Sequence, residues 1–286
     1  LQHLRGRIEI EQLRVGAFGE GRGRIQDVSG RIAGLSVSKL SAPVDWTNDV
    51  LRIPAISGVL VGGELVGDFM MHTAEPVAYQ GSATVRGFDV ARLRDDLAPT
   101  GPAYAGRGTA QMTFQNRGGT SRDLTAAGYV QIRGAQLGDL PIVANVFVLT
   151  DSMVGVEERP QFERADVDFT LEKEVFTFSR VDIAGPLFSM PGTGTLDLNG
   201  IVDLRFTPDF IKGMLVPGVK QVPGVGEVLR ALLREEVLYA VRLHGDLGST
   251  KTDVVPLPLF GYERGSDFEG TVSRTLPRRR LPGWFR

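Results

Sequence analysis

The sequence predicts a mainly β fold: a long twisted antiparallel sheet curled into a hydrophobic groove or a flattened barrel, with two short helices. Apolar and polar residues alternate along most of the chain, in segments separated by turn residues, as in antiparallel strands with one apolar face. A short glycine-containing word also recurs. With 36 glycines, 16 prolines, 42% hydrophobic and 23% charged residues, the composition suits a globular or elongated β-rich chain.

The recurring word occupies residues 32–40, 85–93 and 132–140, with a glycine at positions 34, 87 and 134. Repeats spaced by about 50 residues indicate stacked supersecondary units. We expect each copy to end a strand, to turn at its glycine, and to place the aliphatic residues that follow as a hydrophobic corner. Chance similarity within a glycine-rich β protein is the alternative.

Two hairpins are expected before residue 134. The pair Gly62-Gly63 predicts a two-residue loop that sets Leu60 opposite Leu65, so that the apolar residues of both strands share a face. Alternation on both sides of residues 116–121 predicts the second hairpin, which turns there. Between them, residues 95–105 contain two prolines and are expected to form a loop.

A third hairpin is expected from about residue 166 to residue 184, and its register follows from its apolar residues. A loop at residues 173–174, or at residues 172–175, sets Leu171 opposite Phe176 and puts the phenylalanines of both strands on one face. The opposite face of the first strand then carries Asp166 and Asp168.

The hairpin at residues 193–206 allows two registers. A two-residue loop at Asn199-Gly200 would set Val202 opposite Asp197, whereas a three-residue loop ending at Gly200 sets Val202 opposite Leu196. We predict the three-residue loop, with Gly200 in the left-handed region, because it places the apolar residues of both strands on one face.

A helix that starts with Pro141 is expected at residues 141–150. A second helix is expected at residues 224–236, where apolar residues recur at helical spacing. We interpret the second helix as a plug against the sheet in preference to a membrane-surface helix. A strand is expected at residues 238–247. The basic tail at residues 277–286 is interpreted as a disordered terminus in preference to a contact with an anionic membrane.

No catalytic constellation is found. His3, His72 and His244 lack metal-ligand spacing, and no nucleophile-elbow or phosphate-loop motif is present. Asp166 and Asp168 are interpreted as a solvated face in preference to a paired-carboxylate site. The absence of cysteine excludes disulfides and thiolate metal sites, and a net charge of −2 gives no reason to expect a nucleic-acid partner. We expect no enzymatic activity, metal or cofactor.

No segment approaches the roughly 18–20 apolar residues of a membrane span. The chain begins at Leu1 without a signal-like segment. We therefore expect a processed chain or a fragment, whose N-terminal anchor would lie outside the sequence.

Several short words follow one another in a characteristic order and spacing. They are GAQLGDLP at 134–141, FERADVDFTL at 162–171, VDIAGP at 181–186, GTGTLDL at 192–198, VDLRF at 202–206 and VRLHGDL at 241–247. Together they make residues 106–258 resemble the C-terminal β region of the AsmA-like family, which is related to TamB and to bridge-like lipid transfer proteins. Residues 1–105 resemble the β-groove repeats that precede this region, and residues 259–286 form a C-terminal tail.

The resemblance implies an envelope protein of diderm bacteria, located in the periplasm and anchored to the inner membrane through an N-terminal segment that this chain lacks. It implies a function in phospholipid transport between the inner and outer membranes and in outer-membrane homeostasis. Acyl chains would lie in the β-groove while the headgroups stay in water. Burial of acyl chains in an apolar trough is favourable by about 0.8 kcal/mol per methylene.

The residues expected to line such a groove are the apolar members of the alternating strands. They are Leu65, Phe69, Met71, Met112, Phe114, Val130, Ile132, Val167, Phe169, Phe176, Phe178, Val202, Leu204 and Phe206. Three alternatives stay open: these residues form an ordinary core; the chain is a scaffold that assists outer-membrane protein assembly; or it is a polysaccharide hydrolase, which would require clustered carboxylates.

Overall fold

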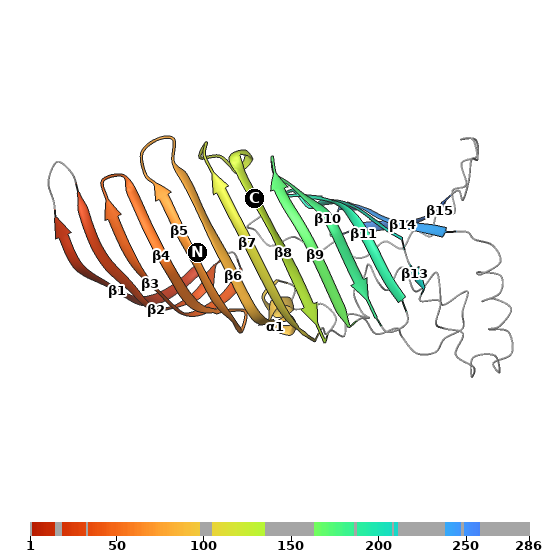
Figure 1. Ribbon diagram of the computed structural model, residues 1–286, viewed down its shortest axis with the longest axis horizontal. Helices are drawn as coiled ribbons and strands as arrows, with labels where there is room; N and C mark the ends of the chain where they lie inside the picture. The colour runs from red at the N-terminus through yellow and green to blue at the C-terminus, as the bar shows by residue number, and fades with distance from the viewer. Residues whose placement is uncertain are drawn as a thin grey trace.

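The computed structural model is one long antiparallel β-sheet (Figure 1). It describes residues 2–14, 19–32, 34–97, 105–134, 163–185, 188–207, 209–210, 238–246 and 249–257. The strands are β1 (Gln2–Arg14), β2 (Glu20–Ile32), β3 (Leu35–Thr47), β4 (Val50–Leu60), β5 (Gly63–His72), β6 (Ala78–Asp89), β7 (Arg107–Asn116), β8 (Leu124–Arg133), β9 (Arg164–Glu172), β10 (Val175–Ala184), β11 (Phe188–Asp197), β12 (Ile201–Phe206), β13 (Asp209–Phe210), β14 (Leu238–Asp246) and β15 (Ser249–Leu257).

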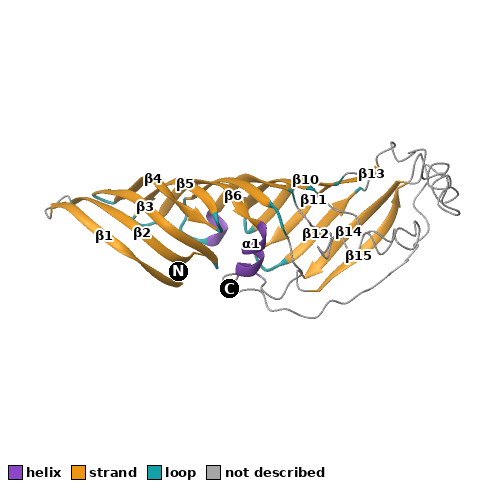
Figure 2. Ribbon diagram, turned by 90° about the horizontal axis from the view of Figure 1, so that it is seen from below, coloured by secondary structure: helices purple, strands orange, loops and turns teal. Residues whose placement is uncertain are grey.

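The strands pair in the order of the sequence. Each strand from β1 to β12 pairs with the next, β12 pairs with β14, and β14 pairs with β15, while the short β13 adds to β11. The mainly β antiparallel sheet predicted from the sequence is confirmed, and across the described residues it is not closed into a barrel. Figure 2 shows the sheet bending along its length, with β12, β14 and β15 turned below β10 and β11.

Register divides the sheet into two chemically different faces. Leu65, Val85, Ala110, Val130 and Val167 are successive partners across β5 to β9, and they share one face because alternate residues of a strand point to the same side. We call this side the apolar face and the opposite side the outer face. Strands β6 and β7 are direct partners, so one sheet contains the strands on both sides of residues 98–106 in the sequence.

Bulges preserve the apolar face where the alternation is broken. In several strands two apolar residues lie three positions apart, which would put them on opposite faces of a regular strand. A shift of register lies between the members of each such pair and returns both to the apolar face. The pairs are Ile25 and Val28, Val37 and Leu40, Ile53 and Ile56, Val85 and Phe88, and Phe178 and Val181.

The β4–β5 turn differs from the prediction by a shift of two residues in register. Val61 and Gly62, with φ of 51° and 79°, form the turn, and Leu60 pairs with Gly63. Leu65 consequently lies opposite Gly58, although it stays on the predicted face. Gly63 is needed for a close approach and not for the turn, since an added Cβ there would lie 2.5 Å from the Phe88 nitrogen.

The left-handed backbone of Val61 is unfavourable for a β-branched residue, and burial and hydrogen bonding offset this cost. Val61 is only 3% exposed and lies within an apolar cluster. Its N–H donates to the Ser36 carbonyl at 2.9 Å, and its carbonyl accepts from the Asp89 N–H at 3.0 Å. The turn thus connects β3 to the end of β6. Asp89 is also the N-cap of a helix, since its carboxylate accepts hydrogen bonds from the N–H groups of Ala91 and Arg92.

That helix is α1 (Val90–Leu97). The prediction of a loop at residues 95–105 is therefore wrong for residues 95–97, and no helix was predicted here. Val90 and Leu93 pack with residues of the apolar face, so α1 lies on that side of the sheet at one end of the strands (Figures 1 and 2). The Asp96 carboxylate fixes the helix: it accepts from the Ser36 N–H at 2.7 Å and from Arg31 Nη2 at 3.0 Å.

The later hairpins agree with the predictions. Leu171 lies opposite Phe176 across a turn at residues 173–174. Val202 lies opposite Leu196, and Gly200 has a φ of 92°, as expected for the three-residue loop. Between β7 and β8 the chain turns through a short 3-10 helix, Ser121–Asp123, and the strand expected at residues 238–247 is β14.

The three glycines of the recurring word all adopt left-handed backbones, with φ of 83° at Gly34, 69° at Gly87 and 61° at Gly134. The predicted turn is confirmed at Gly34, but Gly87 lies within β6 at a register shift and does not end the strand. The copies nevertheless build different elements. The first makes the β2–β3 hairpin, the second leads from β6 into α1, and the third ends β8. The helices predicted at residues 141–150 and 224–236, and the tail at 259–286, lie outside the described residues.

Gly63→Ala tests the close approach of the β5 backbone at Gly63 to the β6 backbone at Phe88. An added methyl would meet the Phe88 nitrogen at 2.5 Å and the Arg86 carbonyl at 2.8 Å, so the backbone must shift. We expect the free energy of unfolding, measured by denaturant titration, to fall by about 1–3 kcal/mol. Gly19→Ala is the control, because nothing lies within 4 Å of its Cβ position; an equal loss in both variants would contradict the prediction.

Candidate functional site: the apolar face

All of the residues predicted to line a groove lie on the apolar face. One row runs through Phe69, Phe114, Leu171, Phe176 and Val202, with small residues between the first members. A parallel row contains Met112, Phe169, Phe178 and Leu204, and the remaining predicted residues belong to neighbouring rows. Sequence alternation within each strand and register between strands therefore combine into one continuous apolar surface.

Aromatic rings on this face lie over glycines of adjacent strands. A Cβ added to Gly81 would be 2.9 Å from the Phe114 ring, and one added to Gly128 would be 2.9 Å from the Phe169 ring. The glycines therefore leave the space that the rings occupy. Because these rings cover the backbone of Gly81 and Gly128, the surface at these two positions consists of ring carbon atoms and not of peptide groups.

The rings form two groups along the sheet. Phe69, Tyr79 and Phe114 have ring centroids 6.2–6.4 Å apart, and Phe176 lies 5.8 Å from Phe169 and 6.4 Å from Phe178. Such separations are typical of aromatic pairs in contact. All six side chains are only partly buried, so both groups are accessible from the apolar side.

Exposure on the apolar face is highest on β1 and lowest on β11 and β14. Ile8 and Ile10 on β1 are 75% and 70% exposed, whereas Met190 on β11 and Leu243 on β14 are 0% and 2% exposed. Trp46, at the end of β3, is 45% exposed. The face is thus open to solvent at β1, mixed from β2 to β10, where for example Val37 and Ala42 on β3 are each 4% exposed, and closed at β11–β14.

The closed end is a packed hydrophobic cluster. Val202, Leu204 and Phe206 are 3%, 8% and 1% exposed and pack with Ala165, Ile183, Met190, Val241 and Leu243, among others. At this end the apolar residues form an ordinary core, which was one of the alternatives left open by the sequence. The predicted residues on β5 to β10 are intermediate in exposure.

The outer face carries charged side chains that pair between neighbouring strands. Arg180 donates to Asp168 at 2.8 Å, and Asp166, which is buried, accepts from Arg133 at 2.7 Å. The hydrogen bond to the Asp168 carboxylate raises the pKa of Arg180. The two aspartates predicted to form a solvated face are therefore separate ion-pair partners and not a paired-carboxylate site, although Asp166 is less exposed than expected.

A bidentate pair stands at the far end of the same face. Arg242 on β14 donates from Nε and Nη2 to the Asp203 carboxylate on β12, at 2.9 and 2.8 Å. These hydrogen bonds hold the pKa of Asp203 below its ordinary value of 3.8 and raise the pKa of Arg242. His244 Nε2 lies 2.8 Å from the Asp253 carboxylate, again between adjacent strands.

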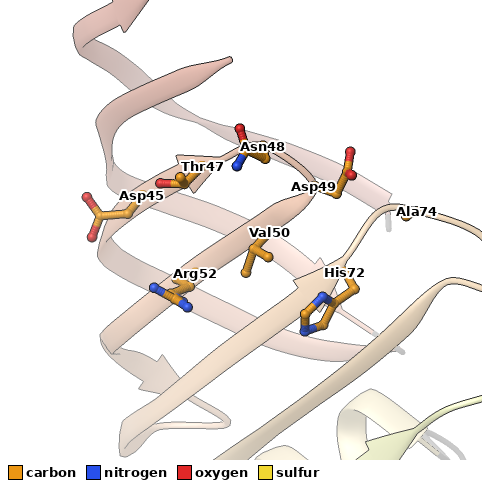
Figure 3. A pocket seen from close by; sticks show the side chains of 8 residues that line it. All are labelled: Asp45, Thr47, Asn48, Asp49, Val50, Arg52, His72 and Ala74. Carbon is orange, nitrogen blue, oxygen red and sulfur yellow. The ribbon is translucent and has the colours of Figure 1, made fainter. Parts of the chain in front are cut away.

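An open pocket of about 380 Å³ lies on the outer face where β3, β4 and β5 meet their turns. Figure 3 shows His72 on one side of it and Asp45 pointing away on the other. Asp45 pairs at 3.0 Å with Arg22, which does not belong to the lining of the pocket. Over the residues that the structure describes, no cluster of histidines and carboxylates could hold a metal ion.

Comparison of the chain with protein-family models, with curated proteins and with solved structures finds no match. In the described part of the chain, no helix combines the length and apolarity needed to cross a membrane. The candidate site therefore rests on geometry. Sequence alternation identified the strand residues of the candidate site from β5 to β12. It missed Ile8, Ile10 and Trp46, which are exposed on the same face, and helix α1, which packs against that face.

The Asp203–Arg242 pair gives a prediction for pH dependence. Because the folded-state pKa of Asp203 is lowered, the stabilisation is fully present above the ordinary pKa of 3.8 and is lost as pH falls through the lowered value. We expect Asp203→Asn to melt at a lower temperature than the parent protein at neutral pH, and the difference to shrink below pH 3.8. A difference that stays constant over this range would contradict the assignment.

Proposed function

We propose that this chain is an AsmA-like protein of the bacterial envelope whose apolar face binds phospholipid acyl chains during transport between the inner and outer membranes. The observation that carries the proposal is the continuity of the apolar face from Ile8 and Ile10 on β1 to β10, on which Phe69, Phe114 and Phe169 among others are partly exposed. Exposed apolar surface of this extent marks a binding site for an apolar partner.

The chemistry of the two faces favours a lipid as that partner. Each methylene that moves from water onto an apolar surface contributes about 0.8 kcal/mol, so a row of rings and aliphatic side chains can hold an acyl chain without hydrogen bonds. The rings that lie over Gly81 and Gly128 reduce the polar backbone within reach of the chain. On the outer face, ion pairs such as Arg180–Asp168 keep the opposite side hydrated.

The exposure gradient limits where lipid binds. The half-buried residues of β5 to β10, among them Phe69, Phe114 and Phe169, are the proposed contacts. Val202, Leu204 and Phe206, which the sequence analysis included, are occupied by core packing and are not proposed as contacts in this conformation. The proposed contacts stop before β11, where Met190 is 0% exposed.

The rest of the proposal follows from the resemblance. The protein would act in the periplasm, anchored to the inner membrane, and would contact both membranes. No cofactor and no catalytic step are proposed.

A second candidate function is favoured by the closed end of the apolar face. A sheet whose last strands bury their own apolar side chains, with Met190 at 0% and Phe206 at 1% exposure, is a stable platform and needs no ligand there. If the same closure extended over β5 to β10 in solution, the chain would act as a non-enzymatic scaffold in outer-membrane protein assembly. Lipid occupancy of the middle strands distinguishes the two functions.

Photo-crosslinking from opposite faces of β7 tests the proposal. A benzophenone amino acid at Phe114 would lie on the apolar face, and the same probe at Thr113 would lie on the outer face of the same strand. After irradiation with phospholipid vesicles, we expect intact-mass spectra to show phospholipid adducts for the first variant and background levels for the second.

The equivalent pair at Phe169 and Thr170 on β9 repeats the comparison in the second aromatic group. Equal lipid adducts from both faces would indicate non-specific contact and contradict the proposal. Adducts to protein alone, with no phospholipid from any position, would favour the scaffold.

A further inference from the structure

On the apolar face, the two ends of strands β3 to β6 differ. One end, which we call the α1 margin, carries a packed cluster whose members are 3–7% exposed: Val61, Val85, Phe88 and Val90, the last of these in α1. The Asp96 carboxylate holds α1 there through hydrogen bonds that it accepts from the start of β3 and the end of β2. The apolar side chains at the α1 margin are therefore already occupied by core packing.

The opposite end of the same strands carries a row of large side chains that are partly accessible. The row lies on the apolar face next to the turns, and its members are successive partners on β3 to β6: Trp46, Leu51, Met71 and Tyr79. Trp46 is 45% exposed, and the other three are intermediate in exposure. We call this end the Trp46 margin. Along these strands the apolar face thus has one covered end and one accessible end.

Two residues of the Trp46 margin combine an aromatic ring with a polar group. The indole N–H of Trp46 donates to the Asn48 carbonyl in the β3–β4 turn. The ring of Tyr79 lies 6.2 Å from that of Phe69 and 6.4 Å from that of Phe114, measured between ring centroids. Tryptophan and tyrosine are enriched where an apolar phase meets water, because one end of the side chain is apolar and the other is polar. The Trp46 margin therefore has the chemistry of a boundary between acyl chains and headgroups.

The distance between the two margins suits one acyl chain. On β5, Met71 of the Trp46 margin lies six residues from Leu65, which packs against the cluster at the α1 margin. At the rise of a β-strand this separation is about 20 Å. One leaflet of a bilayer supplies half of a hydrocarbon core of roughly 30 Å. An acyl chain of ordinary length that begins at the Trp46 margin can therefore lie along the strands and end before it meets α1.

We propose that a phospholipid lies along β3 to β6 with its headgroup at the Trp46 margin and the ends of its acyl chains toward α1. Helix α1 then acts as a stop that limits the length of acyl chain held on the apolar face. This inference rests on the proposed function, and it adds the orientation of the lipid and a role for α1.

Quenching of tryptophan fluorescence tests the orientation. The chain has two tryptophans, so Trp284→Phe leaves Trp46 as the only one. The variant is titrated with vesicles of phosphatidylcholine that carry a nitroxide either on the headgroup or on the terminal carbon of an acyl chain. We expect the headgroup label to cause the larger loss of Trp46 fluorescence. Equal losses, or a larger loss with the label at the end of the acyl chain, would overturn the orientation.

A tryptophan at Thr47 is the matched control, because Thr47 is the next residue and lies on the outer face. In the triple variant Trp46→Phe, Thr47→Trp and Trp284→Phe, we expect either label to cause no more loss of fluorescence than unlabelled vesicles do. Quenching as strong as that of Trp46 would show that the vesicle surface reaches both faces alike, and it would overturn the proposal.

Crosslinking of the unaltered chain tests the role of α1. Phosphatidylcholine with a diazirine on the terminal carbon of an acyl chain is compared with phosphatidylcholine that carries the diazirine on the headgroup, and the adducts are located by peptide mass spectrometry. We expect the acyl-end probe to label α1 and the peptides that contain Leu65 or Phe88. The headgroup probe should label the turns at residues 48–49 and 73–77.

The outcomes separate this inference from the proposed function. Lipid adducts that are distributed alike for the two probes, or in the reverse order, would overturn the orientation while leaving lipid binding in place. An absence of lipid adducts with both probes would contradict the proposed function and this inference together.

Discussion

The structure depends on one constraint: the register of consecutive antiparallel strands must keep apolar residues on the same face. A slip of one residue in any pair would move that strand's apolar side chains to the outer face. The bulges are part of this constraint. Val85 and Phe88, or Phe178 and Val181, could not share a face in a regular strand, and the register shift between them returns both to the apolar side.

Glycine contributes to the apolar face in two ways. At Gly34, Gly87 and Gly134 it supplies a left-handed backbone that ends or bends a strand. At Gly81 and Gly128 it leaves room for a neighbouring phenylalanine ring to cover the backbone. The resulting surface is aromatic and aliphatic, with its polar groups engaged in the sheet, and this is the property on which the proposed binding of acyl chains rests.

Closure of the face is uneven, and this shapes its proposed function. The last strands bury Met190, Phe206 and Leu243 in a core that stabilises one end, while the first strands leave Ile8 and Ile10 in solvent. Between them α1 covers the apolar face at one end of the strands, tied to the β2–β3 corner through Asp96. The stable closed end leaves β1 and the partly exposed middle strands as the part of the face that a ligand could reach.

The sequence by itself indicated most of the strands after residue 56, their faces and most of their turns, because period-two alternation is local; it was sufficient to place Leu171 opposite Phe176 and Val202 opposite Leu196. It did not indicate β1, β2 or β15. Three features depended on tertiary structure. The Val61-Gly62 turn is held by Ser36 and Asp89, distant residues that hydrogen-bond with the Val61 backbone. Helix α1 depends on Ser36 and Arg31, distant residues that bind Asp96. Which apolar residues stay accessible was decided by how the sheet bends, and strand alternation carries no information about bending.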